Sequence, residues 1–156
     1  MPKLSSYIDS FLIRSADLFR PPLDVDPLPV VRPEGARGVI VSFYMANISR
    51  AVVAAQRRVL KRFAPPDVAI AQVLTDVDHG VSIDRFARTT PYRAFVVLDI
   101  DCIPVREGAI EDLFGRAERG AVVGAAQRAD HIANNDHIYA GPFCVGVTME
   151  TYAKLG

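Results

Sequence analysis

The chain has 156 residues, which fits one globular domain, and half of them are hydrophobic, enough for a sizeable core. Eighteen Lys and Arg balance eighteen Asp and Glu in an interleaved pattern, so the formal net charge is zero. This balance argues against broad electrostatic binding to nucleic acid or to an anionic membrane. No run approaches the ~20 apolar residues of a transmembrane segment. Cys102 and Cys144 lie in apolar segments and resemble small buried residues, which favours a reducing cytoplasm.

The first 37 residues are expected to precede the folded domain, which spans residues 38–156. Residues 1–20 carry apolar side chains at rough helical spacing, which predicts an amphipathic helix. Packing on the domain is the simpler role for this helix, and a membrane-surface helix is the alternative. Charged residues interrupt the apolar ones, so the layout is not that of a signal peptide. Residues 21–37 contain five prolines and are expected to form an extended linker.

From Gly38 onward, strand and helix patterns alternate. Strands are expected at 39–44, 68–74, 94–98, 121–126 and 143–148. Helices are expected from a cap at Asn47 or Ser49 to Phe63, and at 81–88, 107–119 and 150–155. Gly141-Pro142 predicts a chain reversal ahead of the last strand. Continuous apolar strands between helices predict an α/β fold of three layers, with helices flanking a mostly parallel, Rossmann-like sheet.

The carboxyl ends of the strands are the places where such sheets bind ligands. The strand at 94–98 runs directly into Asp99 and Asp101. Because successive strand residues point to opposite faces, strict strand geometry would place both carboxylates on one side. They would repel each other unless a cation lay between them, and Mg²⁺ or Mn²⁺ suits oxygen ligands and bridges to a diphosphate. The alternative is a pair of helix-capping or solvated turn aspartates.

Asp99-Ile100-Asp101 after an apolar strand resembles the DxD motif of GT-A glycosyltransferases. Three further segments resemble that family in the same order: Val39–Tyr44 with Asn47 and a helix, His79-Gly80 ahead of the motif, and the strand and helix from Phe143 to Leu155-Gly156. The resemblance covers about residues 38–156. It implies that Asp99 and Asp101 bind Mn²⁺ or Mg²⁺ and the diphosphate of a nucleotide-sugar, and that the sugar passes to an acceptor that the sequence does not identify.

The resemblance also implies ligand contacts at the neighbouring strand ends. Ser42, Tyr44 and Asn47 lie where a nucleotide base would stack or form hydrogen bonds, and Asp76 follows the second strand, where it would accept hydrogen bonds from the base or ribose. Helix capping and core packing explain the first three residues equally well. A solvated turn explains Asp76, and a turn also explains His79-Gly80.

Other charged residues have weaker claims to a role. Arg85 or Arg88 would suit a diphosphate, although the exposed face of a helix is the simpler interpretation. His131 and His137, together with Asp136, would complete the metal site or contact the sugar, and a solvated loop is the alternative.

The end of the sequence limits what the resemblance implies. The family places an acidic catalytic base shortly after the Leu-Gly, whereas this sequence ends at Gly156. Binding of a nucleotide-sugar is therefore expected more than full glycosyl transfer, and the catalytic base is unassigned. The last strand and helix would lose apolar cover, so self-association, or docking of residues 1–20 on the domain, is a further expectation.

Two other functions begin from the same two aspartates. Haloacid-dehalogenase-like phosphatases place a nucleophilic Asp and an acid/base Asp at this spacing and form an aspartyl-phosphate. They also need a Ser or Thr at the next strand end, a Lys and an acidic pair, whereas here the fourth strand ends in Gln127-Arg128 and the only late lysine is Lys154. A non-catalytic binding or assembly domain is the second alternative. A sugar nucleotidyltransferase is disfavoured because Ser42 to Ser49 contains no glycine.

Overall fold

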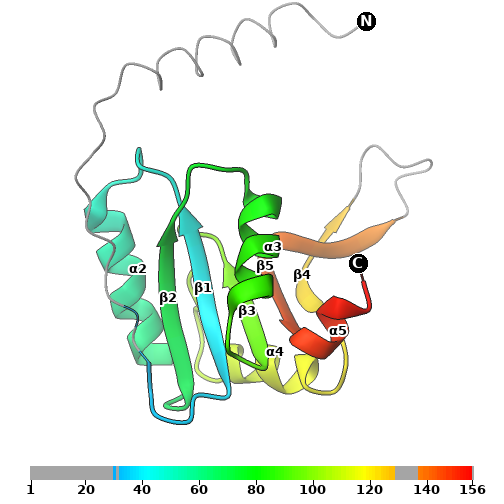
Figure 1. Ribbon diagram of the computed structural model, residues 1–156. Coiled ribbons are helices and arrows are strands. Elements are labelled where there is room, and N and C mark those ends of the chain that lie inside the picture. The colour runs from blue at the N-terminus through cyan, green and yellow to red at the C-terminus, as the bar shows by residue number, and fades with distance from the viewer. Residues whose placement is uncertain (1–29, 31, 129–136, 156) are drawn as a thin grey trace, which may run out of the picture.

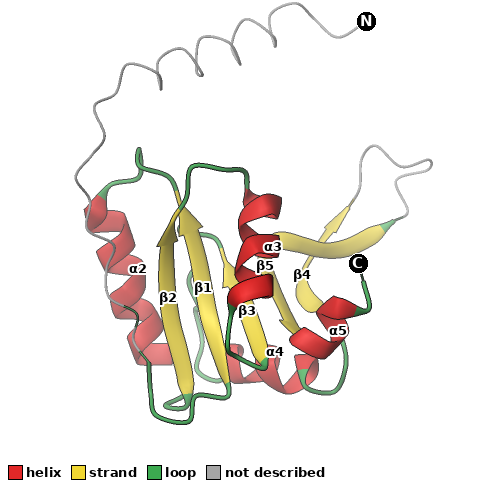
Figure 2. Cartoon of the chain, in the orientation of Figure 1, coloured by secondary structure: helices red, strands yellow, loops and turns green. Residues whose placement is uncertain are grey.

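The structure is a computed structural model, which describes residues 30, 32–128 and 137–155. These residues form one five-stranded sheet with helices on both faces (Figures 1 and 2). The predicted α/β fold class is therefore confirmed, and the layers are compatible with a Rossmann-like arrangement. The helix expected at 1–20 and the segment that contains His131 and Asp136 lie outside the described residues.

Within the described residues, helices and strands alternate as the sequence predicts until β4 and β5, which follow each other without a described helix between them. The strands are β1 (Gly38–Tyr44), β2 (Val68–Leu74), β3 (Ala94–Leu98), β4 (Val123–Arg128) and β5 (Ile138–Thr148). The helices are α2 (Arg50–Phe63), α3 (His79–Thr89), α4 (Ala109–Ala117) and α5 (Met149–Ala153). None of these helices, in the part of the chain that is described, is long and apolar enough to cross a membrane.

The strand order is β2-β1-β3-β5-β4. β1 pairs in parallel with both β2 and β3, whereas β5 pairs antiparallel with both β3 and β4. Four strands thus point one way and β5 is reversed. The predicted mostly parallel sheet is therefore confirmed. The reversed direction of β5 was not predicted, because apolar periodicity does not encode the direction of a strand.

Each face of the sheet has its own hydrophobic core because successive strand residues point to opposite faces. Val39, Val41 and Phe43 of β1 pack on the face that α3 and α5 cover, and Figure 1 shows these two helices on the near side. Ile40 packs on the opposite face with Leu60 of α2 and with residues of α4. β1 is covered on both sides, which explains its continuous apolar sequence.

The Gly141-Pro142 pair lies inside β5 and does not reverse the chain, so that prediction is wrong. The register of β5 against β4 shifts between Gly124 and Ala126. Proline has no N–H for a strand ladder, and Pro142 falls where this pairing is interrupted. A Cβ at Gly141 would lie 2.4 Å from the Phe143 ring, so a larger residue at this position would have to displace that ring.

Side-chain caps define where the helices begin at the carboxyl edge of the sheet. Ser49, and not Asn47, caps α2 by accepting a hydrogen bond from a first-turn amide at 3.2 Å. Asp78 caps α3, because its Oδ1 accepts a hydrogen bond from the Val81 amide at 2.9 Å. This cap starts α3 at His79, two residues before the predicted start.

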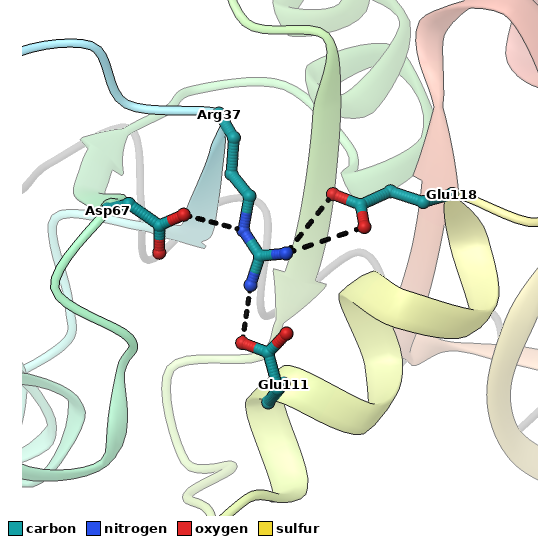
Figure 3. Close-up of polar contacts among 4 residues, drawn as sticks. All are labelled: Arg37, Asp67, Glu111 and Glu118. Atoms are coloured by element: carbon teal, nitrogen blue, oxygen red, sulfur yellow. Dashed lines mark hydrogen bonds and ion pairs between the residues drawn. The ribbon is translucent and has the colours of Figure 1, made fainter.

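An arginine joins the amino ends of the strands to α4 (Figure 3). Arg37 Nε lies 3.0 Å from Asp67 Oδ2, and one terminal nitrogen lies 3.3 Å from Glu118 Oε1. The other terminal nitrogen pairs with Glu111, and the guanidinium carbon lies 5.6 Å from the centroid of the Phe114 ring. Burial lowers the pKa of Arg37, but the hydrogen bond to Glu111 and the three carboxylate charges outweigh burial and raise it. Arg37 therefore offsets part of the negative charge of these three carboxylates.

Cys102 and Cys144 are free thiols, and both are partly buried. They pack against the core on the α2 and α4 face of the sheet. Burial raises the pKa of both thiols, which fits the predicted role as small packing residues.

Candidate functional site

A cleft of about 340 Å³ opens at the carboxyl ends of β1, β2 and β3. Three loops line it: the loop after β1 contributes Asn47, the loop after β2 contributes Asp78, and the turn after β3 contributes Asp99 and Asp101. In an α/β sheet this edge is the usual place for a ligand. The structure therefore brings Asn47, Asp99 and Asp101 together at the edge that the sequence predicts.

The two candidate metal ligands lie in a tight turn. β3 ends at Leu98, and the Asp99 carbonyl accepts a hydrogen bond from the Cys102 amide at 2.8 Å. The prediction that strand alternation places both carboxylates on one side therefore does not apply, because neither residue is in the strand. The turn brings both to the cleft instead. The Asp99 amide donates to the Phe143 carbonyl at 2.9 Å, which ties the turn to β5.

Acidic groups dominate the charge of the cleft. Asp78, Asp99 and Asp101 line it, and no Lys or Arg is among its described lining residues. Burial raises the pKa of the Asp99 carboxyl; His79 opposes this effect and the Asp101 charge adds to it. The Asp101 charge therefore acts on the Asp99 carboxyl across the turn.

His79 is a cleft residue to which the sequence analysis assigned no contact. Its Nε2 lies 3.1 Å from the Pro142 carbonyl oxygen and 3.4 Å from Asp99 Oδ1. Its ring meets the edge or face of the Phe43 ring nearly at right angles, with centroids 5.8 Å apart. We call the turn of residues 99–102 the aspartate turn. His79 thus links the first turn of α3 to β5 and to the aspartate turn. The sequence signal for it is weak, since a histidine after a helix cap has many ordinary explanations.

Ser42 and Tyr44 are less accessible than a base-binding role requires. Ser42 is fully buried, does not line the cleft, and its Oγ has no hydrogen-bond partner among the described residues. Tyr44 borders the cleft, but only 4% of its surface is exposed, which leaves little of the ring for stacking. Of the three residues predicted on the first loop, Asn47 is the one with an exposed side chain in the cleft.

Asp76 lies in a neighbouring groove of about 510 Å³, which it shares with Arg85 and Arg88. Phe43 and Thr75 border both the groove and the cleft, so the two spaces adjoin. Arg88 donates to a carboxylate of its own helix at 2.8 Å. Arg85 has no acidic partner in the part of the chain that is described.

His137, the other described residue of the predicted polar loop, is exposed and does not line the cleft. Its predicted companions His131 and Asp136 lie outside the described residues. The described structure therefore brings no member of that loop to the aspartate turn.

The residues of the turn fit a hard divalent cation that takes few protein ligands. No group of three or more His, Cys, Asp or Glu side chains in residues 32–128 and 137–155 is arranged to hold a metal ion. Mg²⁺ commonly takes one or two carboxylates and completes its shell with water and phosphate oxygens. Asp99 and Asp101 match that donor set, whereas a closed structural site of four side chains does not fit.

The chain matches no protein-family model and no curated protein.

Proposed function

We propose that this chain is a GT-A-like domain that binds a nucleotide-diphosphate sugar at the cleft, with Mn²⁺ or Mg²⁺ held by Asp101 with help from Asp99. One observation carries the proposal: two interacting carboxylates share a cleft at the carboxyl edge of the sheet, and no Lys or Arg lines it among the described residues. Such an arrangement favours an external cation. The cation supplies Lewis-acid neutralisation of the diphosphate leaving group.

Different residues of the cleft and the adjoining groove would contact different parts of the ligand. Asp101 is exposed and free to meet a cation, whereas Asp99 is more enclosed and its amide is tied to β5. Asn47, on the loop after β1, lines the same cleft. The adjoining groove gives a ligand room to extend, with Asp76 as the acceptor for base or ribose hydrogen bonds and Arg85 as a cation for phosphate.

Calorimetry with UDP tests the proposal on the full chain. UDP is expected to bind in the presence of Mn²⁺ and not after chelation with EDTA, and Asp101→Ala is expected to abolish the heat of binding. Asp112→Ala is the matched control, because Asp112 is an exposed acid in α4 that pairs with Arg106 and does not line the cleft. Equal binding by the wild type and Asp101→Ala would show that the assigned site is wrong.

A non-catalytic nucleotide-sugar-binding domain is the second candidate, and the position of Asp78 favours it. Asp78 is the one described acid of the cleft outside the aspartate turn, and its Oδ1 caps α3. Its carboxylate is thereby engaged in structure and is a poor general base. The expectation is UDP binding without release of sugar from UDP-glucose or UDP-N-acetylglucosamine in the presence of Mn²⁺. Rapid Mn²⁺-dependent turnover would reject this candidate and support a transferase.

A further inference from the structure

Three polar side chains form a connected chain of hydrogen bonds beneath α2. Arg57 Nε donates to Gln72 Oε1 at 2.8 Å, and Gln72 Nε2 donates to Gln56 Oε1 at 2.8 Å. Gln72 Nε2 also donates to the Val53 carbonyl at 2.8 Å. All three side chains are buried, with exposed fractions of 8%, 3% and 2% for Arg57, Gln72 and Gln56. We call this set the α2 relay.

The α2 relay ends on the aspartate turn. Gln56 Nε2 donates to the Asp99 carbonyl at 2.7 Å and to the Cys102 carbonyl at 3.0 Å. These two carbonyls are the first and last of the turn that contains Asp101. One amide group therefore holds both ends of the turn, and the Asp99 carbonyl also accepts from the Cys102 amide.

A contribution to the stability of the fold does not by itself explain the α2 relay. Its neighbours on this face of the sheet are apolar, among them Leu60, Ile70 and Val96. Burying an arginine and two amides in such surroundings is unfavourable unless every group is paired, and well-packed apolar replacements are often as stable. Burial lowers the pKa of Arg57, with Tyr44 acting in the opposite direction, which is the expected sign for a desolvated cation.

The pairing of the relay is directional. Gln56 uses its carbonyl oxygen to accept from Gln72 and its amide nitrogen to donate to the turn, so Gln72 fixes which way the Gln56 amide faces. Gln72 is fixed in turn by Arg57, which offers only donors. The Arg57 guanidinium thus orients Gln72, and Gln72 orients the Gln56 amide so that its N–H groups face the turn.

We propose that Gln56 is a positioning residue that holds the Asp99–Cys102 turn in the shape that presents both carboxylates to the cleft before a cation arrives. That the turn binds a cation rests on the proposed function. That Gln56 restrains the turn does not depend on it. Preorganisation of this kind lowers the cost of ordering the ligands at the moment of binding. Gln56 needs no contact with the cation or the nucleotide, since it acts through the backbone of the turn.

Amide hydrogen exchange tests the hold on the turn without any ligand. Gln56→Met keeps the size of the side chain and removes both donors. Relative to the amides of β1, exchange of the Cys102 amide is expected to accelerate roughly tenfold or more. Leu60→Ala is the matched control, because Leu60 lies one helical turn later, is fully buried and has no hydrogen bond to the aspartate turn. It is expected to destabilise the fold without selective exchange at Cys102.

Wild-type protection of Cys102 in Gln56→Met would overturn the proposal, as would equal selectivity in Leu60→Ala. Gln72→Met serves if Gln56→Met fails to fold, because it leaves Gln56 in place but removes the group that orients it. Its expected effect on Cys102 exchange is in the same direction and smaller. Protection of Cys102 unchanged relative to β1 would again reject the role.

Calorimetry with Mn²⁺ and UDP then separates this proposal from the proposed function. If the wild type binds, Gln56→Met is expected to bind roughly tenfold more weakly, and Leu60→Ala is expected to bind like the wild type once folded. Wild-type affinity in Gln56→Met would overturn the positioning role while leaving the site intact. If the wild type does not bind, the proposed function fails, and the exchange measurement still decides whether Gln56 holds the turn.

Discussion

Both ends of the sheet gather three carboxylates, but only at one end does the described structure place an arginine or lysine among them. At the amino ends of the strands, Asp67, Glu111 and Glu118 surround Arg37 (Figure 3). At the carboxyl ends, Asp78, Asp99 and Asp101 line a cleft whose described lining contains no Lys or Arg. Two clusters with the same number of carboxylates therefore differ in whether an arginine of the chain offsets their charge.

The comparison gives a physical criterion for recognising a candidate site. Carboxylates arranged around an arginine of the chain have part of their negative charge offset by it, and each such exposed pair stabilises the fold only modestly. Carboxylates placed together without such a partner repel one another, and the fold tolerates that repulsion where a ligand relieves it. We expect substitutions at the two ends to have different effects on stability.

The largest expected effect on stability is at the amino end. Arg37→Met should lower the free energy of unfolding by about 1–2 kcal/mol, because each partly exposed ion pair contributes less than about 1 kcal/mol but three carboxylates then face one another. Urea denaturation measures the change, and added salt should recover part of it by screening the repulsion. Arg62→Met, which removes an exposed arginine of α2, should stay within about 0.5 kcal/mol. Equal effects of the two substitutions would remove the contrast between the ends.

A smaller loss is expected at the helix cap that borders the cleft. Asp78→Ala removes the acceptor for the Val81 amide and should destabilise the protein by about 1 kcal/mol. Asp76→Ala is the matched control, because Asp76 is an exposed aspartate two residues earlier with no hydrogen bond or ion pair among the described residues. The two variants are compared by urea denaturation. Similar stabilities would mean that the cap contributes nothing and that Asp78 is available for another role.

The smallest effect is expected in the aspartate turn. Asp101→Asn removes one of two repelling charges without removing a hydrogen bond of the described structure. The free energy of unfolding should therefore stay the same or rise by up to about 0.5 kcal/mol. The same substitution should abolish Mn²⁺-dependent binding of UDP. A loss of stability above about 1 kcal/mol would place Asp101 with the structural acids.

The central strands could be predicted from sequence because both of their faces are buried. Val39–Tyr44, Val68–Leu74 and Ala94–Leu98 are continuous apolar runs, and the structure places β1, β2 and β3 within one residue of those bounds. β5 was harder to predict, because its first half pairs only with β4 and contains Gly141-Pro142. From local sequence, Gly-Pro predicts a turn. It fits within β5 because the hydrogen-bond ladder to β4 is interrupted there.

In the candidate site, too, some residues could be predicted from local sequence and others depend on tertiary packing. Asp99 and Asp101 follow an apolar strand directly, so local sequence was enough to predict them at the carboxyl edge. Ser42 was predicted beside them, but α2 covers its face of the sheet and buries it. Gln56 was missed as a site residue because it reaches the turn across 43 positions of sequence. Contacts of that kind arise only when a helix docks on the sheet.

One consequence of the β5 contacts concerns protein synthesis. The Asp99 amide donates to the Phe143 carbonyl, and His79 Nε2 lies within hydrogen-bond distance of the Pro142 carbonyl. A nascent chain that has left the ribosome as far as Arg128 already contains Asp99 and Asp101 but lacks both carbonyls. At ribosomal rates the missing strand arrives about 1–3 s later. During that interval the acidic turn has no β5 to anchor it, so the cleft is complete only after Phe143 emerges.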